Sequence, residues 1–148
     1  MAMDKKSIFI IGGLFVVFYF MIFFKAPSEL PTDVRASIWD TSYLIMVDVL
    51  VNSSPYEPLS EEQYEEYNEF IDSYSADATA ANPLTENEKT ILYHLKGLVY
   101  HAQQFRILYT ECGQCYTDEA NEQLSKMVES ELELLSIYNV NASEFYSN

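Results

Sequence analysis

An uncharged apolar run near the N-terminus constrains this chain more than any other feature. It extends from Ser7 to Phe24, 18 residues without a charged side chain, between Lys5 and Lys6 on one side and Lys25 on the other. A helix of that length spans roughly 27 Å, and flanking lysines reach towards the headgroups, so it nearly matches a hydrocarbon core of about 30 Å. We therefore expect residues 7–25 to form one transmembrane helix.

The anchor segment consists mostly of large apolar side chains, each contributing roughly 0.3 to 0.6 kcal/mol to insertion near the bilayer centre. The membrane-anchor residues that we single out are Ile8, Phe9, Gly12, Gly13, Phe20 and Phe24. The glycine pair is tolerated because a helix in lipid satisfies its own backbone hydrogen bonds. No small residue follows four positions after either glycine, so the sequence predicts no specific pairing through them.

A cleaved secretory signal is the alternative interpretation of the same segment. Lys5 and Lys6 form a basic start, and residues 26–28 (Ala-Pro-Ser) are of the small type that a signal peptidase accepts. The apolar run, however, exceeds the usual length of about 7 to 15 residues and meets Lys25 directly after bulky side chains. We favour a retained signal-anchor. Either interpretation exports the rest of the chain.

The basic residues around the run favour an N-terminus in the cytoplasm. The expected organisation is a short cytoplasmic segment (1–6), the transmembrane helix (7–25), a linker (26–32), an acidic helical domain (33–140) and a tail (141–148). We expect the domain on the extracytoplasmic side, in the periplasm, the extracellular space or a lumen. Its length suits one domain with its own core, and not two.

Start signals and apolar spacing predict an all-α fold, a small antiparallel bundle of about four helices after the anchor. The expected helices run from Thr32 or Asp33 to about Val51, from a Ser60–Gln63 capping box to about Tyr74, from a Thr85–Glu88 capping box towards Gly113, and from Thr117 to Tyr138. The segment Tyr43–Val51 is apolar on nearly every side, which also suits a β-strand. We favour a helix because one strand has no sheet to join.

The last two expected helices each carry an apolar stripe that we expect to face the core. In the third helix the stripe is Ile91, Leu95, Leu98, Ala102, Phe105 and Tyr109. In the fourth helix it is Leu124, Met127, Val128, Leu135 and Tyr138. The tail after these helices shows no period.

The chain after residue 25 is strongly acidic, with 22 acidic and 5 basic side chains. The second expected helix carries much of this charge and has no lysine or arginine; its acidic residues are Glu61, Glu62, Glu65, Glu66, Glu69 and Asp72. Like charges four residues apart repel by roughly 0.2 to 0.5 kcal/mol a pair. Three explanations stay open: a solvated face screened by salt, a docking face for a basic partner, and loose divalent-cation binding without an ordered loop. The charge argues against nucleic acid or anionic lipid as a partner.

Tyrosine is abundant, with 12 residues in the chain. Its ring covers contact area at a low entropy cost and keeps a polar tip, which suits both interfaces and the periphery of a small bundle. We take Tyr64 and Tyr67, with the acidic residues of the same helix, as the expected partner-binding site.

Cys112 and Cys115 form the one CxxC motif. A dithiol oxidoreductase places such a pair at the start of a helix, whereas this pair follows one, and haem attachment needs a histidine where Tyr116 stands. His94 and His101 lie seven residues apart, about 10.5 Å along a helix, too far to share a zinc ion. We expect a structural disulfide, and neither a metal site nor a cofactor.

No nucleophile and base are paired by the sequence, and only 4 glycines are present, none in a phosphate-binding loop. We therefore expect a non-catalytic protein, an accessory or structural subunit whose partners are the other subunits of a larger membrane complex. One alternative is a membrane-tethered binding or inhibitor module for a basic soluble protein. A second is a tethered thiol oxidoreductase that uses Cys112 and Cys115. No small-molecule substrate is expected.

Overall fold

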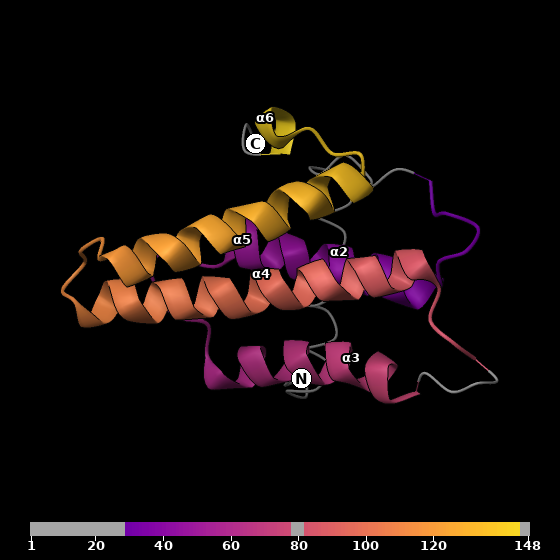
Figure 1. Cartoon of the computed structure of the whole chain (residues 1–148), viewed down its shortest axis with the longest axis horizontal. Coiled ribbons are helices and arrows are strands. Elements are labelled where there is room, and N and C mark those ends of the chain that lie inside the picture. Colours follow the sequence, from indigo (N-terminus) through magenta and orange to yellow (C-terminus); the bar gives the residue numbers. More distant parts are fainter. Residues whose placement is uncertain (1–28, 78–81, 146–148) are drawn as a thin grey trace, which may run out of the picture.

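The computed structural model describes residues 29–77 and 82–145, and within these ranges the chain is all-helical (Figure 1). The elements are α2 (Ala36–Val47), the π-helix η1 (Asp48–Asn52), α3 (Glu61–Asp77), α4 (Glu86–Glu111), α5 (Asp118–Ile137) and the short α6 (Ala142–Phe145). The prediction of an all-α bundle is confirmed for this part of the chain. The expected anchor at residues 7–25 lies outside the described residues, and no described helix is long and apolar enough to cross a membrane.

Helix α4 is the centre of the bundle. In Figure 1, α5 lies along one side of α4 as the second arm of an antiparallel hairpin, α3 lies along the other side, and α2 lies behind. The predicted stripe of α4 is confirmed from Ile91 to Phe105: Leu95, Leu98 and Ala102 are completely buried and form part of the core. Tyr109, the last residue of the stripe, is half-buried. The opposite side of α4 carries exposed residues, among them Tyr93 and Tyr100.

The start of α2 differs from the prediction. The N-cap residue of α2 is Arg35, not Thr32 or Asp33, and the Arg35 side chain makes no capping hydrogen bond to the helix. The Arg35 backbone N–H instead donates to Glu88, 53 residues away at the start of α4, at 2.9 Å. Two guanidinium nitrogens of Arg35 donate to the same carboxylate at 2.8 and 2.9 Å. Local sequence signals predict only caps that a helix receives from neighbouring residues. They cannot predict a hydrogen-bond partner that belongs to another helix, such as Glu88.

Helix α2 continues into the π-helix η1 rather than ending as an α-helix. The Ser53 N–H donates to the Asp48 carbonyl at 2.8 Å, five residues back, and the buried Arg106 of α4 donates from Nη2 to the Val49 carbonyl at 2.6 Å. The Asp48 carboxylate accepts a hydrogen bond from the Tyr67 hydroxyl of α3. Burial, together with this bond, raises the pKa of Tyr67. Asp48 therefore links the end of α2 to α3, and the Val49 carbonyl next to it links the same segment to α4.

The predicted starts of the last three helices are confirmed. The Ser60–Gln63 and Thr85–Glu88 capping boxes both form, and the Thr117 side chain accepts from the Ala120 N–H at the start of α5. These local bonds satisfy N–H groups that a helix leaves unpaired at its first turn. The boundaries of α3, α4 and α5 therefore follow from short sequence motifs.

The predicted buried face of α5 is confirmed at Leu135 and Tyr138 and is wrong at Val128. Val128, predicted to face the core, is 38% exposed, whereas Leu134 is completely buried. Tyr138 at the end of α5 is also completely buried, and its hydroxyl donates to the Trp39 carbonyl at 3.0 Å. Packing against α4 and α2 sets the rotation of α5, and apolar spacing alone does not reveal which of two adjacent residues points inwards. The turn α6 lies in the expected tail.

Candidate partner-binding groove

The exposed side of α4 forms the floor of a groove between α3 and α5. Tyr93, Gly97 and Tyr100 follow one another at spacings of four and three residues, so they share one face of the helix. They line a groove of about 560 Å³ with residues from both neighbouring helices. Tyr93 is 74% exposed and Tyr100 is 46% exposed. The floor therefore presents two aromatic rings to solvent.

Gly97 brings α5 close to the floor of the groove. A Cβ atom at position 97 would lie 2.6 Å from the Ser130 Oγ and 3.6 Å from the Ser130 Cβ. Any side chain at this position would therefore press against Ser130, which is itself buried. The Ser130 side chain therefore occupies the space that a side chain at position 97 would need.

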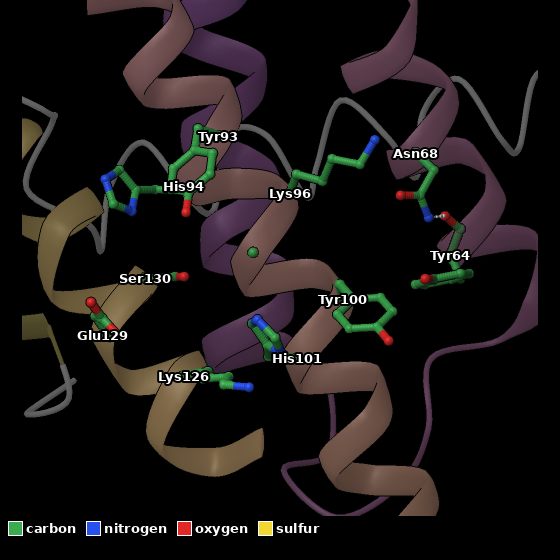
Figure 2. A pocket seen from close by; sticks show the side chains of 11 residues that line it. Tyr64, Asn68, Tyr93, His94, Lys96, Tyr100, His101, Lys126, Glu129 and Ser130 are labelled. Carbon is green, nitrogen blue, oxygen red and sulfur yellow. Dashed lines mark hydrogen bonds between the residues drawn. The ribbon is translucent and has the colours of Figure 1, made fainter. Parts of the chain in front are cut away.

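The two walls differ in character (Figure 2). On the α3 side, Tyr64 and Asn68 line the groove, and Tyr100 and Lys96 of α4 lean towards them. On the α5 side the lining residues are Lys126, Glu129 and Ser130, and His94 of α4 leans towards this helix. The groove thus combines tyrosine rings, two histidines and two lysines.

One row of residues rich in carboxylates passes through the groove-lining residues of each neighbouring helix. Residues 61, 65, 68 and 72 form one row along α3, and residues 122, 126, 129 and 133 form one row along α5, because members of each row are three or four positions apart. Asn68 belongs to the first row, and Lys126 and Glu129 to the second; all three line the groove. The carboxylates of the two rows are Glu61, Glu65, Asp72, Glu122, Glu129 and Glu133. We call these two rows the acidic rims.

The two lysines of the groove are paired with the rims. Lys96 Nζ lies 2.8 Å from Asp72 Oδ1, and Lys126 Nζ lies 2.6 Å from Glu122 Oε1. The hydrogen bond from Lys126 lowers the pKa of Glu122 and raises that of Lys126. Each lysine therefore offsets one carboxylate, and the rims keep a negative excess.

The histidines are placed for contact rather than for metal binding. His101 Nδ1 lies 2.7 Å from Gln123 Oε1 of α5, and the His101 ring packs at 5.1 Å from the Tyr100 ring. Within residues 29–77 and 82–145, no group of three His, Cys, Asp or Glu side chains is placed to hold a metal ion. His94 and His101 both line the groove.

The predicted partner-binding residues of α3 are divided between two sides of the helix. Glu61, Glu62, Glu65, Glu66 and Glu69 are all exposed and line a shallow acidic hollow. Asp72 is exposed and pairs with Lys96. Tyr64 and Tyr67 are half-buried and pack against the core; Tyr64 also lines the groove, whereas Tyr67 bonds Asp48. Of the predicted residues, Tyr64 lines the groove and Asp72 is linked to it through Lys96, whereas Glu61 and Glu65 line the acidic hollow.

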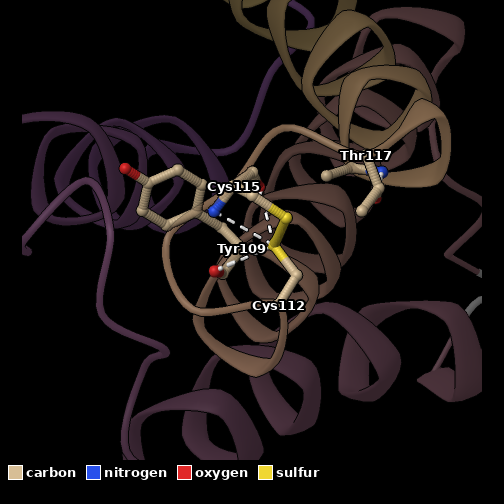
Figure 3. The surroundings of a disulfide bond; sticks show 5 residues. Tyr109, Cys112, Cys115 and Thr117 are labelled. Carbon is tan, nitrogen blue, oxygen red and sulfur yellow. Dashed lines mark hydrogen bonds between the residues drawn. A yellow bond between two sulfur atoms is a disulfide. The ribbon is translucent and has the colours of Figure 1, made fainter.

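The cysteine pair lies at the far end of the α4–α5 hairpin. Cys112 and Cys115 form a disulfide with a Cα–Cα distance of 5.5 Å, as predicted, beside the Tyr109 ring (Figure 3). Gly113 and Gln114 between them both have positive φ angles, 74° and 67°. Cys112 follows the C-terminal end of α4, where the helix dipole disfavours a thiolate. This placement favours a structural staple over a reactive dithiol.

The sequence analysis did not select Tyr93, Gly97 or Tyr100. Their signal was present as a small, aromatic-rich row on the side of the helix opposite the predicted apolar stripe. A scan against protein-family models and searches of curated proteins and solved structures find no match to this chain. The function is therefore inferred from the groove itself.

Proposed function

We propose that this chain is a non-catalytic, single-pass membrane protein that serves as an accessory subunit of a larger membrane complex. Residues 7–25 anchor it, with the N-terminus in the cytoplasm, and the acidic helical domain contacts its partners on the extracytoplasmic side. The apolar run Ser7–Phe24 supports the anchor, since 18 uncharged residues nearly match the thickness of a bilayer core. An interaction role requires a surface suited to a protein partner.

The exposed groove on α4 is the observation that carries this proposal. Tyrosine is enriched at the centres of protein interfaces, and a groove with flanking polar residues has the anatomy of such a site. Tyr93 and Tyr100 expose large rings there, although rings of this size gain from burial. The acidic rims add an electrostatic preference for a basic surface.

This proposal is tested by extracting the full-length protein together with its partners, and by repeating the extraction with the truncated chain 26–148 for comparison. Native membranes are dissolved in a mild detergent, the extract is separated by size, and co-migrating proteins are identified by mass spectrometry. An accessory subunit is expected to co-migrate with a defined set of membrane proteins, and the truncated chain is expected to lose most of that association. The proposal fails if the full-length chain migrates alone.

The tethered binding module remains the alternative. It predicts that the truncated chain keeps its full affinity and that the co-migrating species is a basic soluble protein. The thiol oxidoreductase predicts instead that the reduced Cys112–Cys115 pair reacts with alkylating reagents much faster than a free thiol at neutral pH. Slow alkylation of the reduced pair would exclude the thiol oxidoreductase.

A further inference from the structure

We infer that the groove on α4 binds an amphipathic helix of the partner, with an apolar stripe flanked on both sides by lysine or arginine. This inference rests on the proposed function, because it names the partner of the same surface. The shape of the groove, the side chains of its floor and the charge of its rims all favour such a helix.

The shape suits a helix. The floor is itself a helix, and α3 and α5 flank it as two parallel walls (Figures 1 and 2). A helix laid between two helices packs its side chains between theirs at axial separations of about 8 to 10 Å. The rim row of α3 runs from residue 61 to residue 72, which is roughly 17 Å along the axis. About three turns of a bound helix would therefore lie between the rims.

The floor requires an apolar stripe. Tyr93 and Tyr100 are two turns apart and both expose their rings, with Gly97 between them in the same row. A partner helix presenting large apolar side chains at helical spacing would cover both rings, the arrangement by which amphipathic helices bind hydrophobic grooves.

The rims require basic flanks. Together they hold six carboxylates, three on each helix, while the groove holds two lysines, each already paired with a rim carboxylate. The negative excess lies on both sides of the floor. A helix with lysines or arginines on both edges of its apolar stripe would pair with both rims, and its basic side chains would also lie near tyrosine faces.

The charge argues against a second copy of this chain as the occupant. Among α2, α3, α4 and α5, no helix carries more basic than acidic side chains. Any of them laid in the groove of another copy would bring no positive excess to the negative rims, and α3 would add strong repulsion. The charges of these four helices therefore favour a helix of a different protein as the occupant.

A designed peptide tests this inference on the full-length protein in nanodiscs of zwitterionic phosphatidylcholine. The probe is a fluorescent peptide of about 14 residues, about four turns, with leucines at helical spacing and lysines on both flanks. The matched control peptide carries glutamate in place of each lysine. Fluorescence anisotropy against empty nanodiscs measures binding. The basic peptide is expected to bind at least tenfold more tightly than the acidic one.

Matched variants separate the groove from general attraction to an acidic protein. Replacing Tyr93 and Tyr100 together by alanine should weaken binding at least tenfold, whereas Tyr116→Ala, at a 53% exposed tyrosine near the disulfide, should leave it unchanged. The rim pair Glu65→Lys with Glu129→Lys should weaken binding at least tenfold. The pair Glu62→Lys with Glu66→Lys changes the net charge of the protein by the same amount, but both positions lie outside the rim rows, and it should have less than a threefold effect. Thermal unfolding confirms that each variant is folded.

Three results would overturn the inference: equal binding of both peptides, wild-type binding by the double tyrosine variant, or equal loss in the two charge-reversal pairs. Self-association that the peptide does not displace would identify a second copy as the occupant instead. The proposed function fails separately. Peptide binding without co-extracted membrane proteins would refute only the role as an accessory subunit. Co-extraction without peptide binding would refute only the inference that the groove binds a helix.

Discussion

The ion pair between Arg35 and Glu88 is expected to be a large single contribution to the stability of the bundle. The Glu88 side chain is 1% exposed and accepts hydrogen bonds from the Arg35 guanidinium, the Arg35 backbone and the Thr85 backbone. These bonds, those from the guanidinium first, lower the pKa of Glu88 from 4.5 to about 2. Glu88→Gln removes the charge and keeps the shape of the side chain.

The expected loss follows from the pKa of Glu88. A drop from 4.5 to about 2 corresponds to roughly 3.4 kcal/mol at 1.36 kcal/mol per pKa unit. Because the Arg35 side chain is 31% exposed, solvent screens part of the pair, and we expect Glu88→Gln to lower the free energy of unfolding by about 2 to 3 kcal/mol at pH 7. A carboxyl group with a lowered pKa stabilises the fold fully above pH 4.5, and this contribution is lost as the pH falls towards 2.

Urea unfolding followed by tryptophan fluorescence measures this loss, since Trp39 is the single tryptophan and is buried in the core. The difference between the wild type and Glu88→Gln should shrink steadily between pH 5 and 3. The matched control is Glu86→Gln, whose side chain is 89% exposed and paired with Lys89; it should change stability by less than about 1 kcal/mol. A Glu88→Gln effect below that of the control, or one that does not change with pH, would refute the reasoning.

Two further predictions concern the groove floor and the hairpin end. Gly97→Ala should lower the melting temperature of the wild type, because the new Cβ would lie 2.6 Å from the Ser130 Oγ. In a Ser130→Ala background the same change should be neutral or stabilise the protein by up to about 1 kcal/mol. A gain in stability in both backgrounds would contradict the close approach of Ser130 to Gly97. Replacing Cys112 and Cys115 together by serine should lower the free energy of unfolding by about 2 kcal/mol, as expected for a short closed loop. It should leave peptide binding unchanged. Loss of peptide binding would assign the disulfide a role in recognition.

The helix starts were predictable because their signals are local. Ser60 with Gln63, and Thr85 with Glu88, lie within one turn of the N–H groups that they satisfy. The start of α2 was not predictable in the same way, since its N–H partner is Glu88 of another helix. The same carboxylate thus serves a predictable local cap and an unpredictable tertiary contact.

The groove was only partly predictable. The acidic residues of α3 were visible as a charge cluster, and Tyr64 was selected with them. Tyr93 and Tyr100 were missed because apolar spacing marks the buried side of a helix, and these residues lie on the other side. Whether a neighbouring helix covers that side depends on how α3 and α5 are placed, which no local pattern specifies.

Site-specific photo-crosslinking in the native membrane tests the central claim most directly. A photoreactive phenylalanine analogue replaces Tyr100 in the groove, and in a matched control it replaces the exposed Ser136 of α5, which does not line the groove. The account predicts a covalent adduct between position 100 and a membrane protein of the complex, with the crosslink on a basic helix, and no adduct from position 136. An adduct from position 136 alone, or one from position 100 to a soluble protein, would contradict it.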